Sequence, residues 1–175
     1  MTGGHAPQAD PSLPVTGVTF PEIENFLDLL SEQTALTFRL PTEAEWEYAC
    51  RAGSAKFFPN GSQLHSEQAN FLYDESGQVV GHGTPLPPGR YPANAFGLHD
   101  MLGNVCEWTA DAWHPDFHYA PADGSPWLDA GKPVHRVIRG GAWDHLPRVL
   151  RASWHDWAPE DARWDNLGFR VAQTI

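Results

Sequence analysis

The chain has 175 residues, of which 41% are hydrophobic, and this is enough material for one domain with a substantial core. Its formal net charge of −11 argues against nucleic acid or anionic lipid as a partner, because both are bound by concentrated Lys and Arg. No apolar run is long enough for a membrane span, so membrane insertion is not expected.

The start of the chain has neither a basic nor an apolar stretch of the kind that directs secretion. We therefore expect a cytoplasmic protein, although a component of a phage particle or of an exported assembly would show the same features. Residues 1–14 are rich in Gly, Pro and polar side chains and are expected to form a flexible lead-in.

The first predicted element is a helix that begins at a capping box formed by Thr19 and Glu22. Apolar residues then recur at intervals of three and four, and this amphipathic pattern ends near Ser31. A strand is expected next, over residues 36–40.

A second helix is predicted from another capping box, Thr42 with Glu45, to Gly53. Residues 54–95 carry mostly turn signals, and the chain as a whole has sixteen Gly and sixteen Pro, which indicates a loop-rich fold. Short strands are predicted at residues 105–109, 136–139 and 168–172.

Cysteines and histidines give weak signals. Cys50 and Cys106 stand in no metal-spaced motif, and two reduced, buried thiols are favoured, although only the fold decides whether they pair. The histidines that invite a metal site are His114 with His118 and His145 with His155. The first pair lies in a Pro-broken loop, where a spacing of four does not place both rings on one helix face.

The last forty or so residues are the most informative part of the chain. Between residues 139 and 170 a frame of Arg, Gly and Pro alternates with assorted aromatic, acidic, imidazole and aliphatic side chains that follow neither a helical nor a strand period. A segment that fills a core would show a period, so this one is interpreted as a contact surface. The frame consists of Arg139-Gly140-Gly141-Ala142-Trp143, Pro147-Arg148, Leu150-Arg151-Ala152, Pro159, Arg163 and Asn166-Leu167-Gly168-Phe169-Arg170-Val171-Ala172.

Several motifs resemble, in the same order, those of the formylglycine-generating-enzyme (sulfatase-modifying factor) family. They are Pro14-Val15-Thr16-Gly17-Val18, the Arg-Leu-Pro-Thr-Glu-Ala-Glu-Trp run over residues 39–46, residues 94–100, Gly103-Asn104-Val105-Cys106-Glu107-Trp108, Arg139-Gly140-Gly141 and Gly168-Phe169-Arg170. The resemblance implies an α+β, C-type-lectin-like fold in which two helices flank a small twisted antiparallel sheet within a loop-rich chain. It also implies a single domain over residues 15–175.

The chain departs from the family at the catalytic position. Members that make formylglycine carry a pair of cysteines shortly after the Arg-Gly-Gly motif, whereas residues 143–150 here contain none. A thiolate-held metal cannot be built there in the same way, so formylglycine generation is not expected. We also expect the chain to lack the family's usual segment before the Pro-Val motif.

A structural calcium ion is the one cofactor that the resemblance implies. Asn104 and Glu107 match positions that hold calcium in some relatives, and calcium takes hard oxygen ligands beside irregular backbone. A plain role in a turn and a strand is the alternative for both residues. At a second calcium site of the family Asn70 matches, but the later carboxylate is replaced by Val79 or a neighbour.

The last forty residues, 136–175, which we call the tail, resemble most the variable region of proteins that are diversified by retroelements on the same scaffold. Ala142 stands here in the place of a Ser. The resemblance implies a variable ligand-binding region at about 139–170 whose anchors hold the backbone. Its mixture of indoles and polar groups is typical of binding surfaces. The residues expected to contact the ligand are Trp143, Asp144, His145, Leu146, Val149, Trp154, His155, Asp156, Trp157, Ala158, Ala162, Trp164 and Asp165.

We therefore predict a binding protein whose partner is an unidentified protein or other macromolecule, and exposed indoles would also permit self-association. The alternative is a metal-dependent oxidase or a catalytic accessory that uses the region of His145 and His155. A third hypothesis, a purely structural domain, predicts that Trp154 and Trp157 are buried.

Overall fold

The computed structural model describes residues 10–59, 61–128 and 135–174, so residues 1–9 of the expected lead-in lie outside the described residues. The helices are α1 (Phe20–Thr34) and α2 (Glu43–Arg51), with a 3-10 turn η1 (Pro147–Val149) in the tail. The strands are β1 (Thr37–Arg39), β2 (Cys106–Ala112), β3 (His135–Arg139), β4 (His155–Pro159), β5 (Leu167–Phe169) and β6 (Ala172–Thr174).

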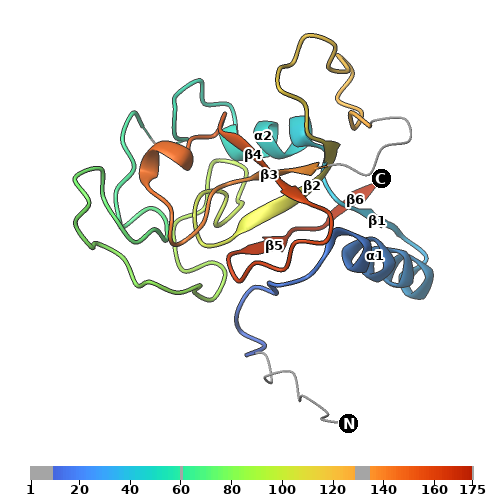
Figure 1. Cartoon of the computed structure of the whole chain (residues 1–175), viewed down its shortest axis with the longest axis horizontal. Helices are drawn as coiled ribbons and strands as arrows, with labels where there is room; N and C mark the ends of the chain where they lie inside the picture. Colours follow the sequence, from blue (N-terminus) through green and yellow to red (C-terminus); the bar gives the residue numbers. More distant parts are fainter. Residues whose placement is uncertain (1–9, 60, 129–134, 175) are drawn as a thin grey trace.

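The strands form two sheets (Figure 1). Four of them lie in the order β4-β3-β2-β5, and β1 pairs with β6 in a separate antiparallel ribbon beside α1. The α+β fold with two helices around a small sheet is confirmed, but the larger sheet is mixed, because β2 and β5 run parallel. Residues 160–166 lead the chain back across the sheet after β4, so β5 starts at the same end as β4.

Both helices begin where the capping boxes predicted. The Thr19 backbone N–H donates to the Glu22 carboxylate over 2.9 Å, and the Thr42 N–H donates to Glu45 over 2.9 Å. Helix α1 runs past Ser31 to Thr34, because Ala35 takes the left-handed conformation (φ 56°) that usually marks a Gly at this position. No helix in the described part of the chain has the length and apolarity needed to cross a bilayer.

Two apolar clusters form the interior. The first lies between α1 and the larger sheet and contains Phe20, Ile23, Leu27, Leu40, Cys106, Trp108, Ile138, Ala142, Ala158, Ala162 and Leu167. The second lies under α2 and the long loops and contains Trp46, Cys50, Phe58, Ala69, Phe71, Met101, Leu102, Leu150 and Ala152. Both clusters include residues of the tail, so the tail is part of the packed interior as well as of the surface.

The tail contains regular structure that the sequence did not indicate. Strand β4 pairs with β3 over five residues, although we expected no strand period in this region. The predicted strand 168–172 is instead two strands, β5 and β6, because the chain leaves β2 after Phe169 and joins β1. Strand β2 continues beyond residue 109 to Ala112 and pairs with β3 on both sides of a register shift.

The Arg-Gly-Gly motif closes β3 with two glycines in left-handed conformations, at φ 90° for Gly140 and 68° for Gly141. A Cβ on Gly141 would lie 2.8 Å from a side-chain carbon of Leu150, and one on Gly140 would lie 3.2 Å from the ring of Trp46. Only glycine satisfies both the backbone angle and the close packing here. The motif therefore turns the chain sharply from the sheet into the tail.

Candidate ligand-binding site

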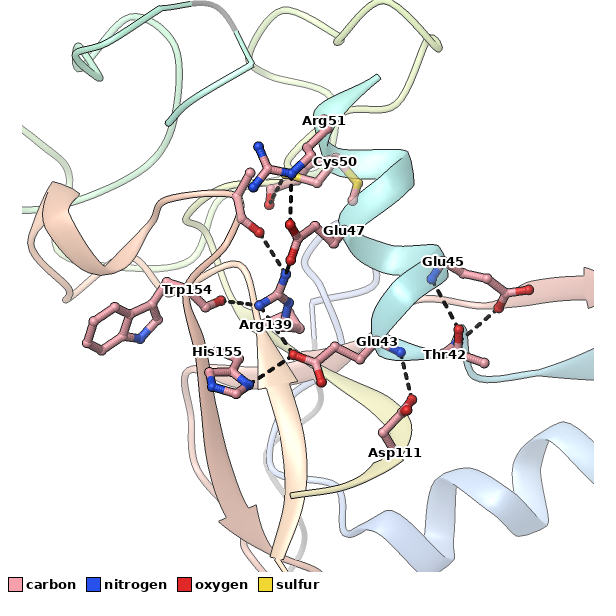
Figure 2. A network of polar contacts seen from close by, with 12 residues as sticks. Thr42, Glu43, Glu45, Glu47, Cys50, Arg51, Asp111, Arg139, Trp154 and His155 are labelled. Carbon is pink, nitrogen blue, oxygen red and sulfur yellow. Dashed lines mark hydrogen bonds and ion pairs between the residues drawn. The ribbon is translucent and has the colours of Figure 1, made fainter. Parts of the chain in front are cut away.

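Arg139, the last residue of β3, is the centre of a polar network that holds the tail (Figure 2). Its side chain is fully buried and forms ion pairs with Glu47 and, at 3.4 Å, with Glu43, both from α2. The same guanidinium donates to the backbone oxygens of Ala152 and Trp154, each over 2.7 Å. Because two carbonyls and two carboxylates converge on one rigid fork, the chain between η1 and β4 is tied to the helix.

His155 belongs to this network and not to the expected contact surface. Its Nδ1 lies 3.0 Å from the Glu43 carboxylate, and its ring stacks on Phe117 with 4.9 Å between centroids. Successive side chains of a strand point to opposite faces, and the next residue, Asp156, faces the other way. The prediction that His155 shares one solvent-facing patch with its neighbours is therefore corrected.

A second anchor connects the end of the tail to the sheet. Both oxygens of Glu107 accept from Arg170, over 2.5 and 2.6 Å, and one of them also accepts the indole N–H of Trp46 over 2.6 Å. Glu107 is 5% exposed. Arg170 thus supplies the charge that this buried carboxylate needs.

The donor set does not fit the structural calcium ion that the resemblance implied. The carboxylate of Glu107 is engaged by the guanidinium, and the side-chain oxygen of Asn104 already accepts the N–H of Leu86 and the amide of Asn70. Asn104 also donates to the carbonyl of Leu86, so its side chain pins that loop. Among the described residues, no group of three or more His, Cys, Asp or Glu is arranged to hold a metal ion.

The surface of the tail contains two adjoining cavities, which we call the paired hollows. The first has a volume of about 320 Å³ and the second of about 670 Å³. Four residues line both cavities: Cys106, Ile138, His145 and Asp156. We call Cys106 and Ile138, which belong to the sheet, the floor of the hollows. Volumes of this size are typical of cavities that bind ligands.

Nine of the thirteen predicted contact residues line the paired hollows. They are Asp144, His145, Leu146, Val149, Trp154, Asp156, Trp157, Trp164 and Asp165. Side chains that are up to twenty-one positions apart in the sequence are thus brought onto one concave surface.

The other four predicted residues lie elsewhere. Ala158 and Ala162 are buried in the first apolar cluster, so the expectation that they face solvent is wrong: they are small because β4 and the following turn pack closely there. Trp143 is partly buried outside the lining, and its indole Nε1 is buried with no hydrogen-bond partner among the described residues. His155 faces α2, as described above.

The exposure of the indoles bears on the purely structural hypothesis. Trp157 is 40% exposed and Trp164 is 42% exposed, while Trp154 is partly buried beside Arg151. Two large apolar rings left at the surface beside a cavity are more typical of a binding face than of a core.

Several lining residues were not predicted as contacts. Arg148, Arg163 and Asn166 were assigned to the frame, and their polar side chains next to variable positions were the available signal. Cys106 and Ile138 belong to β2 and β3, far from the tail in the sequence, and only the sheet register brings them beneath it.

The two cysteines are free and buried, which matches the favoured interpretation. Burial raises the pKa of the Cys50 thiol to about 12. Burial also raises the pKa of Cys106, and the carboxylates of Asp144 and Asp156 raise it further. At neutral pH both side chains are therefore thiols, the form that is poor at binding soft metals.

The family model of the sulfatase-modifying factor enzyme 1-like domain matches residues 2–175. The chain is 44% identical over 130 residues to the formylglycine-generating enzyme of Mycobacterium tuberculosis, covering 70% of this chain and 41% of that protein. It is 33% identical to the hercynine oxygenase of Mycolicibacterium smegmatis, covering 98% of this chain and 40% of that protein.

A further relative is a protein of which this chain corresponds to a smaller share. The serine/threonine-protein kinase pkn1 of Chlamydia caviae is 34% identical over 93% of this chain, which corresponds to 24% of that protein. This chain therefore spans between about a quarter and two-fifths of these curated relatives.

Among solved structures, PvdO from Pseudomonas aeruginosa superposes with a TM-score of 0.86 at 36% identity, over 96% of this chain and 64% of PvdO. The Treponema denticola variable protein 1 superposes with a TM-score of 0.75 at 23% identity, over 97% of this chain and 74% of that one. At the latter identity the similarity shows a common fold.

Proposed function

Because the chain belongs to the sulfatase-modifying factor family, we propose that it is a binding member of that family, a variable protein diversified by a retroelement. It presents a ligand-binding surface on a C-type-lectin-like scaffold. The observation that carries this proposal is the convergence of nine scattered variable-type residues on the paired hollows.

The division between frame and surface supports the proposal. The anchors Arg139, Gly140 and Gly141 are buried, and Arg170 is paired with a buried carboxylate. By contrast, Asp144, Trp157, Trp164 and their neighbours lie at the surface. Substitutions at exposed positions away from caps and networks usually change stability by no more than about 0.5 kcal/mol, so such a surface tolerates variation.

The fold itself is compatible with this use. The Treponema denticola protein, which is named for its variability, has the same scaffold over nearly the whole of this chain. Fold alone does not determine function; the residues of the hollows and the missing catalytic cysteines are what favour binding over catalysis.

The proposal is tested at the encoding locus. We expect a near-identical repeat of the codons for residues 136–175 that differs mainly at adenines, with a reverse transcriptase gene close by. A locus with neither feature would remove retroelement diversification from the proposal.

A metal-dependent oxidase or catalytic accessory is the second candidate, because formylglycine-generating and oxygenase relatives are well matched and the paired hollows contain both Cys106 and His145. Against it, residues 143–150 lack the cysteine pair, and the raised pKa of Cys106 disfavours a thiolate ligand. Stoichiometric uptake of iron or copper by the purified protein, lost in His145→Ala, would support this candidate instead.

A further inference from the structure

The paired hollows are lined by three aspartates and two arginines, and the arginines have their carboxylate partners elsewhere. Asp144, Asp156 and Asp165 line them, and no Lys or Arg of the described chain forms an ion pair with any of the three. The amide of Asn166 donates to Asp144 over 3.0 and 3.1 Å, and His145 Nε2 lies 3.9 Å from the same carboxylate. The backbone N–H of Trp157 donates to Asp156 over 2.8 Å.

Two arginines line the hollows, but both are drawn to carboxylates outside them. Arg163 contacts Glu22 over 2.6 Å and donates to the backbone oxygen of Gly17 over 3.1 Å. Arg148 lies 3.6 Å from Glu75. Neither Glu22 nor Glu75 lines a hollow, so each of these arginines has its carboxylate partner outside the hollows.

The aspartates also affect the residues on the floor of the hollows. The carboxylates of Asp144 and Asp156 are among the causes, after burial, that raise the pKa of the Cys106 thiol. These two carboxylates therefore act on the floor residue Cys106 as well as on the rim. Carboxylates outnumber arginines in the lining of each hollow, and an excess of one sign of charge in a cavity attracts ligands of the opposite sign.

The walls of the hollows are aromatic. Trp154 lines the smaller hollow, and Trp164 lines the larger one. Trp157 also borders the larger hollow, although its ring packs against His135 and Trp113. Indole faces attract cations, more strongly than other aromatic rings do, and they also stack on planar guanidinium groups. Each hollow thus combines an indole with carboxylates, a combination suited to a positive charge carried on an apolar stem.

We propose that the paired hollows bind a segment of a protein partner through its basic side chains, with an Arg or Lys seated in each hollow. This inference rests on the proposed binding function and specifies its ligand class. A peptide segment is favoured over a small cation because the two hollows meet at His145 and Asp156, so the surface continues from one carboxylate-lined cavity into the next.

The experiment uses two capped peptides, one of alternating Arg and Gly and one with citrulline in place of each Arg. Citrulline has nearly the same shape as arginine but no charge. We expect the Arg peptide to shift the indole N–H signals of Trp154, Trp157 and Trp164 in 15N-resolved spectra, and to bind at least tenfold more tightly than the citrulline peptide. Equal binding of both peptides, or binding of neither, overturns the cationic ligand class.

Variants test the position of the site. Asp156→Asn with Asp165→Asn is expected to weaken binding of the Arg peptide at least tenfold. Asp161→Asn is the matched control, because Asp161 is an exposed aspartate of the same tail that lines neither hollow. Thermal melts show that each variant is folded. Equal weakening in the control overturns the assignment of the binding site to the paired hollows.

Two further outcomes are separate. If N-acetylarginine methylamide binds as tightly as the Arg peptide, the occupant is a small cation and the peptide segment is overturned. If the citrulline peptide binds as well as the Arg peptide, the hollows still bind a ligand, so the proposed binding function survives while the charge requirement fails. The retroelement component is decided independently, by the locus.

Discussion

At the scale of single residues, Arg139 connects α2 to the tail through one buried guanidinium. Replacing it by Ala would leave Glu43 without its arginine, Glu47 with Arg51 alone, and two backbone oxygens without this donor. Breaking a buried ion pair from one side costs about 3–5 kcal/mol. We expect Arg139→Ala to lose stability of this order in urea unfolding.

The control for that measurement is Arg148→Ala. The Arg148 side chain is 63% exposed, and its contact with Glu75 is long, so its loss should change the unfolding free energy by no more than about 0.5 kcal/mol. Similar losses in the two variants would show that the network does not fix the tail.

Glu107 gives a second prediction at this scale. Since its carboxylate serves Arg170 and Trp46, neither EDTA nor added calcium should move the melting temperature of the protein. Glu107→Gln should destabilise it by about 1.5–3 kcal/mol, the usual value for hydrogen bonds to a charged group. A rise of several degrees on addition of calcium would restore the calcium site that we consider incompatible with the donor set.

At the scale of elements, the start of α1 should respond to acid through Glu22. Hydrogen bonding to Arg163 and then to Thr19 lowers the pKa of Glu22 from 4.5 to about 2. A lowered pKa stabilises the fold above pH 4.5, and this contribution disappears as the pH falls towards 2. The stability difference between the wild type and Glu22→Gln should therefore shrink across this interval in urea titrations. Glu32→Gln, at an exposed position of the same helix, is the control.

The elements also show what the sequence could predict. The starts of α1 and α2 were predictable because capping boxes are local: Thr19 with Glu22 and Thr42 with Glu45 satisfy one another within four residues. Strand β4 was not readable, because its hydrogen bonds come from β3 and its residues alternate between α2, the hollows and the core. A strand with such an environment shows no hydrophobic period. The lack of a period in the sequence therefore did not mean that the segment was irregular.

The candidate site, like the fold, was only partly predictable from the sequence. The frame identified which residues reach the surface of the tail, since Asp144, Trp157 and Trp164 do line the hollows. The inward positions of Ala158 and Ala162 depend on the twist of the sheet beneath them, which no nearby residue encodes. The floor residues Cys106 and Ile138 required the register between β2 and β3.

At the scale of the whole molecule, the two free thiols should report global unfolding. Cys50 and Cys106 lie in different apolar clusters and have raised pKa values, so a thiol reagent should label neither rapidly in the native protein. Both should react at once in concentrated urea, and dithiothreitol should not change the melting temperature. Fast labelling of one thiol without denaturant would reveal local opening of its cluster.

The pairing of β1 with β6 has a consequence for any mechanism that rewrites residues 139–170. Strand β5, which pairs with β2, lies at the end of this region, and strand β6, which pairs with β1, follows it. A premature stop codon or a frameshift inside it would leave an early strand without a partner and β2 with an open edge. Such products would not complete the fold, and cellular proteases would remove them. Only full-length, in-frame versions of the tail would then persist as folded protein. The need to complete both sheets would thus remove truncated and frame-shifted variants before they reach a ligand.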